Sequence, residues 1–138
     1  MRHLEHEIRE LIATRAFIHT YGCQMNEYDS HTIASELVAG GHDLAQHEGD
    51  ADLVILNTCA VRGKPVEKVL TVLGELRKQR RAGRDLTLAL MGCLAQLEEG
   101  REIAAKFGVD LLIGPGAITD ILPALERLEA GEAHVESL

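Results

Sequence analysis

The sequence predicts an α/β fold: one three-layer α/β/α domain around a roughly five-stranded, mostly parallel sheet in the flavodoxin-like or Rossmann-like order 2-1-3-4-5. Short apolar runs, such as 53–57 and 86–91, are typical of strands that are buried on both faces. Longer segments with a helical period of apolar residues separate these runs. The 138 residues match the usual size of one domain. Because helices join consecutive strands, we expect parallel pairing with right-handed crossovers.

The chain divides into three stretches. Residues 1–14 are expected to be a helical N-terminal extension, because apolar residues such as Leu4 and Ile8 share one helical face. Residues 15–130 form the predicted domain. Residues 131–138 are polar, and we expect them to be a tail or the start of a linker.

In the N-terminal half of the domain, two strands flank one helix. The apolar run 16–18 predicts the first strand, and a loop is expected over 21–25. Asn26 is a favourable N-cap for the next helix, which ends at the pair Gly40-Gly41. The segment 43–46 is expected to be a short strand at the edge of the sheet.

The C-terminal half repeats the alternation. Pro65 suits the first turn of a helix that ends near Gly83. After the strand over 86–91, the sequence predicts a loop over 92–97. The last predicted elements are a helix over Glu98–Phe107, a strand over Leu111–Ile113, a turn over 114–116 and a helix over 119–129.

Charge is distributed unevenly along the chain. The net charge is −8, which disfavours a free nucleic-acid-binding module, and with no Trp a base-stacking platform is nearly excluded. The segment from Arg62 to Arg84 nevertheless holds eight cations and two carboxylates. We interpret this run as a solvated helix end, and contact with nucleic-acid phosphates is the alternative.

The sequence favours a cytoplasmic protein. No apolar run approaches the ~18 residues that a membrane span needs. Charged and apolar residues alternate near the N-terminus, which is unlike a secretory signal. The three cysteines are odd in number and widely spaced, so a disulfide framework is not expected.

The three cysteines carry the central functional inference. Cys23, Cys59 and Cys93 each fall within about three residues of the end of a predicted strand. In the predicted order these strands are immediate neighbours, and parallel strands end at the same edge of a sheet. We therefore expect the three thiols to converge at one edge, where open α/β sheets bind ligands.

Thiols in this setting suit a soft metal. Each cysteine leads into a predicted helix, whose N-terminus favours the thiolate form, and thiolates select zinc or iron–sulfur clusters. Two alternatives stay open at this point. In one, the cysteines are unrelated core residues; in the other, they form a structural zinc site together with His19 or His31.

Three motifs surround the cysteines. They are TYGCQMNEYDS at 20–30, NTCAVR at 57–62 and MGCLAQ at 91–96. In sequence and order these motifs resemble the N-terminal domain of the radical S-adenosylmethionine methylthiotransferases. The resemblance implies that Cys23, Cys59 and Cys93 bind an auxiliary four-iron, four-sulfur (4Fe-4S) cluster. Its open iron would carry the sulfur or methylthio group that the enzyme inserts into a C–H bond.

The residues Gln24-Met25-Asn26 are most similar to the tRNA branch of this family. The resemblance then implies a transferase that adds a methylthio group to C2 of N6-isopentenyladenosine near the anticodon. Branches that act on threonylcarbamoyl-adenosine tRNA or on a ribosomal protein are the alternatives. Implied partners are tRNA, a sulfur donor and a radical-SAM domain that binds S-adenosylmethionine and a second 4Fe-4S cluster.

Two departures from the family pattern stand out. Gly63 and Pro65 replace the usual residues after Arg62, which we expect to alter only the start of the helix. The family's C-x3-C-x2-C module and C-terminal RNA-binding domain are absent from this sequence. We therefore expect this chain alone to be inactive. A different class of protein, a non-catalytic doubly wound binding module, is disfavoured because neither G-x-G-x-x-G nor a P-loop is present.

Further candidate site residues lie beside the cysteines. Asn57 and Thr58 are expected to fix their loop through side-chain to backbone hydrogen bonds. Arg62 adds positive charge beside Cys59. Together with Gln24 and Asn26, these residues are predicted to surround the cofactor without binding its metal directly.

Overall fold

The computed structural model describes residues 14–21, 24–58 and 64–138, and the side chains of 24, 25 and 64–66 lie outside that description. The expected N-terminal helix falls, apart from Thr14, outside the described residues. Across the described ranges, no helix combines the length and the apolar composition needed to span a bilayer.

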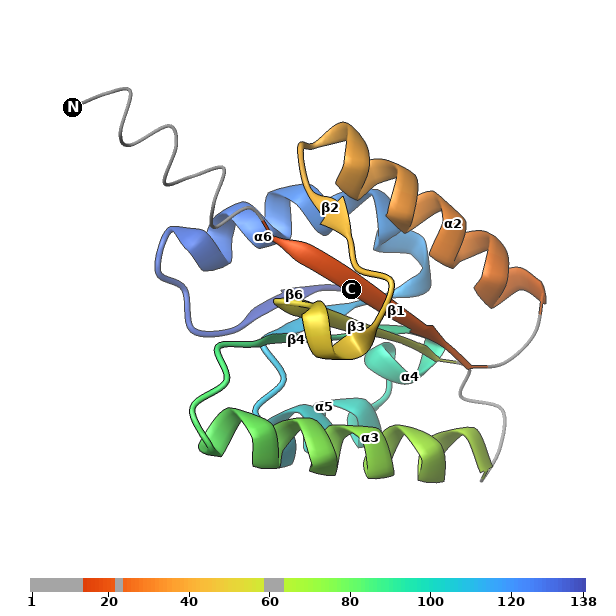
Figure 1. The fold of residues 1–138 in the computed structure, drawn as a ribbon. Coiled ribbons are helices and arrows are strands. Elements are labelled where there is room, and N and C mark those ends of the chain that lie inside the picture. The colour runs from red at the N-terminus through yellow and green to blue at the C-terminus, as the bar shows by residue number, and fades with distance from the viewer. Residues whose placement is uncertain (1–13, 22–23, 59–63) are drawn as a thin grey trace.

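A six-stranded, all-parallel sheet forms the centre of the domain, in the order β2-β1-β3-β4-β5-β6 (Figure 1). This confirms the predicted fold class and the order of its first five strands. The strands are β1 (Arg15–Thr20), β2 (Asp43–Leu44), β3 (Leu53–Thr58), β4 (Thr87–Gly92), β5 (Leu111–Ile113) and β6 (Val135–Ser137).

Helices cover both faces of the sheet. In Figure 1, α3 and α5 lie on one face, and α2 and α6 lie on the other. The α-helices are α2 (Gln24–Ala39), α3 (Lys64–Arg81), α4 (Cys93–Gln96), α5 (Glu98–Phe107) and α6 (Ile121–Glu129). Two 3₁₀ helices, η1 (Glu48–Asp50) and η2 (Pro115–Asp120), complete the described elements.

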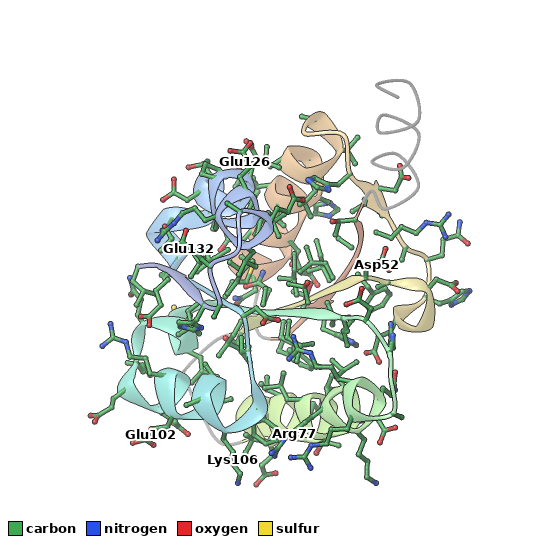
Figure 2. All side chains as sticks on the ribbon, turned by 90° about the vertical axis from the view of Figure 1, so that its left-hand side faces the viewer. Asp52, Arg77, Glu102, Lys106, Glu126 and Glu132 are labelled. Atoms are coloured by element: carbon green, nitrogen blue, oxygen red, sulfur yellow. The ribbon has the colours of Figure 1, made fainter. Side chains whose placement is uncertain are left out.

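Burial on both faces explains the continuous apolar runs of the central strands. In β3, Val54 and Leu56 enter the core beneath α3 and α5, whereas Leu53 and Ile55 enter the core beneath α2 and α6. None of these four side chains is exposed to solvent. Charged side chains, such as those labelled on α3, α5 and α6 in Figure 2, lie on the outer surfaces of the helices.

The sheet is wider than predicted because residues 131–138 are not simply a tail. Val135 pairs with Leu111 at the start of β6, and its side chain is only 1% exposed. Its N–H donates to the carbonyl of Asp110 over 2.9 Å. A three-residue strand with one buried apolar side chain has too short a pattern to be read from sequence.

Two helix boundaries and one additional helix also differ from the predictions. The helix predicted to start after Asn26 begins at Gln24, so Asn26 is an interior residue and not an N-cap. The expected loop over 92–97 contains the single turn α4. The helix predicted over 119–129 begins at Ile121 because η2 occupies the preceding residues. Single turns fall below the length at which helical periodicity is detectable.

Substitution of Val135 by Ala tests whether β6 is part of the core. Because the Val135 side chain packs against the α2 and α6 side of the sheet, we expect the free energy of unfolding to fall by about 1–2 kcal/mol. Leu138→Ala is the matched control, since Leu138 is 43% exposed and should change it by less than about 0.5 kcal/mol. Urea denaturation measures both. Equal stabilities of the two variants would show that residues 131–138 are a tail and not part of the core.

Candidate functional site

The carboxyl ends of β1, β3 and β4 meet at one edge of the sheet. Thr20 is in register with Asn57, and Asn57 with Met91. One residue further along, Thr58 is in register with Gly92, and the N–H of Tyr21 donates to the carbonyl of Asn57 over 2.8 Å. The three cysteine motifs therefore begin at the ends of neighbouring strands.

Cys93 is the predicted metal ligand that the structure describes. It is the first residue of α4, directly after β4, and it is exposed. An exposed thiol at the end of a parallel strand suits a soft metal or an iron–sulfur cluster. Cys23 and Cys59 lie outside the described residues, so the convergence of three sulfur atoms stays a prediction.

Two buried carboxamides link α2 to β3 at this edge. Asn57 is fully buried and Asn26 is 6% exposed. The Asn57 Nδ2 donates to the carbonyl of Asn26 over 2.6 Å and to Ser30 Oγ over 2.9 Å. In return, Asn26 Nδ2 donates to Asn57 Oδ1 over 3.2 Å and to the carbonyl of Thr58 over 3.1 Å.

A second link joins β3 to β4. Thr58 is fully buried, and its Oγ1 donates to the carbonyl of Met91 over 2.8 Å. Gly92 follows with a φ of 94°, in the left-handed region that disfavours side chains. A Cβ at this position would lie 2.2 Å from the carbonyl oxygen of Thr58. The two strand ends therefore approach as closely as they do only because residue 92 is glycine.

An aromatic pair lies on the same strand end. The rings of His19 and Tyr21 stack with their centroids 5.9 Å apart, and His19 Nε2 hydrogen bonds to Glu48. Burial and, to a smaller extent, the negative charge of Glu48 raise the pKa of Tyr21. Of the histidines considered for a zinc site, His19 is thus engaged by Glu48, and His31 lies exposed on α2.

The predicted residues around the cofactor divide into two groups. The structure brings Asn26, Asn57 and Thr58 into one hydrogen-bonded network. Arg62 lies outside the described residues, and for Gln24 only its backbone position at the start of α2 is described. Among the described residues, no three or more His, Cys, Asp or Glu side chains are grouped closely enough to hold a metal ion.

Sequence reasoning missed Ser30, which completes this network. Its Oγ accepts from Asn57 and also hydrogen bonds to Thr20 Oγ1 over 2.7 Å. The available signal was its spacing: Ser30 lies four residues after Asn26, on the same face of α2.

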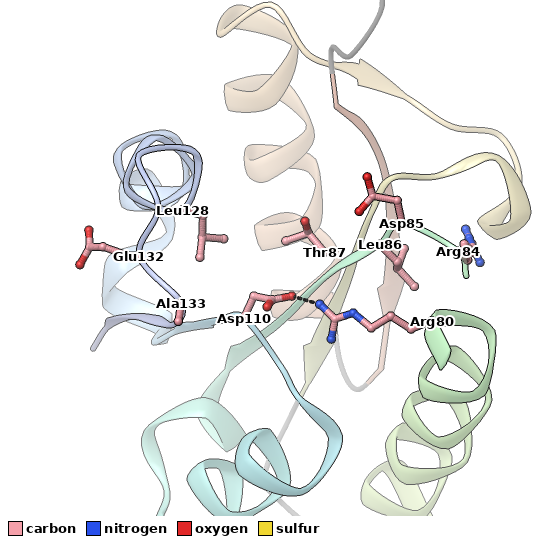
Figure 3. Close-up of a pocket in the computed structure, with 9 residues that line it drawn as sticks. All are labelled: Arg80, Arg84, Asp85, Leu86, Thr87, Asp110, Leu128, Glu132 and Ala133. Atoms are coloured by element: carbon pink, nitrogen blue, oxygen red, sulfur yellow. Dashed lines mark hydrogen bonds and ion pairs between the residues drawn. The ribbon is translucent and has the colours of Figure 1, made fainter. Parts of the chain in front are cut away.

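A hollow of about 340 Å³ at the opposite edge of the sheet does not offer a comparable site (Figure 3). Arg80 donates to the Asp110 carboxylate over 2.5 Å, and that carboxylate also accepts the N–H of Leu88 over 2.9 Å. Arg84 donates to the carbonyl of Ala51 over 2.8 Å and to that of Glu48 over 2.5 Å. Both guanidinium groups are therefore bonded within the protein.

These contacts show that the cations of the basic segment, residues 62–84, do not all have the same role. Arg80 and Arg84 stabilise the fold, whereas Lys68, Lys78 and Arg81 are exposed along α3. The side chains of Arg62 and Lys64 are outside the described residues. The described cations therefore divide between internal contacts and a solvent-facing helix surface.

Comparisons with known proteins agree on one family. Residues 15–114 match the family described as uncharacterized protein family UPF0004. Over 117 residues, or 85% of this chain, the sequence is 60% identical to tRNA-2-methylthio-N(6)-dimethylallyladenosine synthase of Thermus thermophilus. It is 58% identical to the enzyme of the same name from Deinococcus radiodurans over 115 residues, or 83% of the chain. These matches cover 25% and 23% of the two relatives, so the chain spans about a quarter of their length.

Substitution of Gly92 by Ala tests the close approach of β3 and β4. The new methyl group would meet the Thr58 carbonyl and would hold a φ that alanine rarely adopts. We expect the free energy of unfolding to fall by at least about 2 kcal/mol. Gly116→Ala is the control, since no atom lies within 4 Å of a Cβ there. Denaturation midpoints that shift equally for both variants would show that the strand ends are not closely packed.

Proposed function

Because the chain belongs to family UPF0004, the N-terminal domain family of the methylthiotransferases, we propose that it serves a tRNA methylthiotransferase as its auxiliary iron–sulfur domain. The substrate of the full-length enzyme would be N6-isopentenyladenosine near the anticodon, which receives a methylthio group at C2. The names of relatives at 58–60% identity support this branch over those that act on threonylcarbamoyl-adenosine or a ribosomal protein. S-adenosylmethionine and the second cluster would be bound by a radical-SAM domain of that protein.

In this proposal Cys23, Cys59 and Cys93 bind a 4Fe-4S cluster. The observation that carries it is the register of the strand ends, since Thr58 lies opposite Gly92 and each directly precedes a predicted cysteine ligand. The exposed thiol of Cys93 fits the soft donor that such a cluster requires. Three cysteine ligands would leave one iron of the cluster without a protein ligand, and that iron would supply a site for sulfur.

The protein's own part is to present and orient the thiols. A described residue of each of α2, β3 and β4 is adjacent in sequence to a predicted cysteine ligand, and the Asn26, Asn57 and Thr58 network joins these elements. Arg62 and Gln24 are proposed, from their sequence positions, to lie around the same group. Because chemistry at the substrate requires the radical-SAM domain, this chain alone is proposed to bind the cluster without catalysing the reaction.

Anaerobic reconstitution with iron and sulfide tests the proposal. We expect about four iron and four sulfide per chain with broad visible absorption, because the proposal assigns one 4Fe-4S cluster to each chain. Cys59→Ala should abolish both uptake and absorption, since only two ligands remain. Uptake of zinc alone, or a cluster that survives substitution of all three cysteines, would contradict the assignment.

Charge reversal on α3 tests the interpretation of the basic segment. Since we interpret Lys68, Arg77 and Arg81 as solvated side chains, their combined change to Glu in the full-length enzyme should alter the Kd for tRNA by less than about twofold. Titration of labelled tRNA at two salt concentrations measures this. A larger loss of affinity with a shallower salt dependence would instead assign this face to phosphate contacts.

A further inference from the structure

We propose that Asn57 is a positioning residue that assembles the carboxyl edge of the sheet before any cofactor binds. This inference rests on the proposed function, because it names the group that orients the proposed cluster site. Asn57 is fully buried at the end of β3. Its side chain hydrogen bonds only to α2 in the contacts described above, through Asn26 and Ser30.

The chemistry of these contacts selects a carboxamide. Asn57 uses both N–H donors, toward the Asn26 carbonyl and Ser30 Oγ, while its Oδ1 accepts from Asn26. Aspartate has the same shape but no donor when ionised. Its second oxygen would lie against the Asn26 carbonyl at the position now 2.6 Å away, and within the described part of the chain its buried charge would have no cation bonded to it. Substitution by Asp therefore turns an attraction between α2 and β3 into a repulsion.

The network reaches every element that carries a cysteine motif. Asn26 extends it from α2 to the carbonyl of Thr58, and the Thr58 hydroxyl extends it to β4 at Met91. In the sequence, Gln24 follows Cys23, Thr58 precedes Cys59 and Gly92 precedes Cys93. All of these hydrogen bonds join protein groups, so we expect α2, β3 and β4 to be arranged in this way without a bound metal.

Preorganisation of this kind alters how long a metal stays bound. Residues that orient ligands without touching the metal typically change metal affinity by about 10–100-fold when they are substituted. We therefore expect Asn57→Asp and Asn57→Ala to release iron about 10–100 times faster than the unchanged chain. Thr58→Val keeps the side-chain shape but loses the hydroxyl donor, so it should also release iron faster. Thr58→Ser keeps the hydroxyl and should release iron as slowly as the unchanged chain.

The first experiment measures iron release from the full chain. Protein reconstituted anaerobically with iron and sulfide is mixed with an excess of iron chelator, and the decay of visible absorption is followed. Thr71→Val is the matched control, because the Thr71 hydroxyl donates to the Glu67 carbonyl on the exposed side of α3. Release rates of the Asn57 variants and Thr58→Val that equal those of Thr71→Val would overturn the proposal.

The second experiment uses metal-free protein and separates positioning from general stability. Hydrogen exchange in Asn57→Ala should accelerate at the Tyr21 amide, which donates to the Asn57 carbonyl, and in the first turns of α2, while α5 keeps its protection. Uniform acceleration throughout the chain, or none at the edge, would overturn the proposal. If Asn57→Ala does not fold, Thr58→Val is used in its place. Hydrogen exchange should then accelerate in β4 while α5 keeps its protection. Failure of the unchanged chain to bind iron, together with the local exchange pattern, would refute the cluster and leave the positioning role supported.

Discussion

Buried polar groups at the ends of β3 and β4 must find hydrogen bonds within the protein, and the edge of the sheet is organised by that requirement. The adjacent elements α2, β3 and β4 provide these hydrogen bonds to one another through Asn26, Asn57 and Thr58, which are all buried. An unsatisfied donor or acceptor here would cost about 1–3 kcal/mol. The position of α2 against the sheet is therefore determined by hydrogen-bond geometry as well as by apolar packing.

The two edges of the sheet are stabilised by different chemistry. At the amino-terminal edge, charged groups such as Arg80 and Asp110 join helix α3 to the strands. At the carboxyl edge, the joining groups are neutral amides and a hydroxyl. These neutral groups hold α2, β3 and β4 in place without adding a fixed charge of their own to this edge.

The sequence was sufficient for most of the fold, because the runs 53–57 and 86–91 are continuous and are buried on both faces. It was insufficient where local preference and tertiary contact disagree. Asn26 has the residue type of an N-cap, yet its amide hydrogen bonds to β3 instead. Val135 supplies the one buried side chain of β6, which is too little for a detectable period.

The candidate site could be predicted in part for a related reason. The alternation of strands and helices favoured a doubly wound sheet, and in the flavodoxin-like order β3 and β4 are neighbours, so the adjacency of Thr58 and Gly92 could be expected. The partners of Asn57 lie in the first turns of α2, so they depend on the residue at which this helix begins. The pattern of residue types does not specify that residue. The meeting of three sulfur atoms remains a prediction, since Cys23 and Cys59 lie beyond the described residues.

Parallel pairing throughout the sheet also has a kinetic consequence. Asn57 and Asn26 are 31 residues apart in the chain, and Thr58 and Met91 are 33 apart. Contacts between such distant segments form only after long loops have closed, which makes parallel sheets slow to fold. The hydrogen bonds at this edge can therefore form only once those loops have closed, and a metal cluster would bind to a chain that has already folded there.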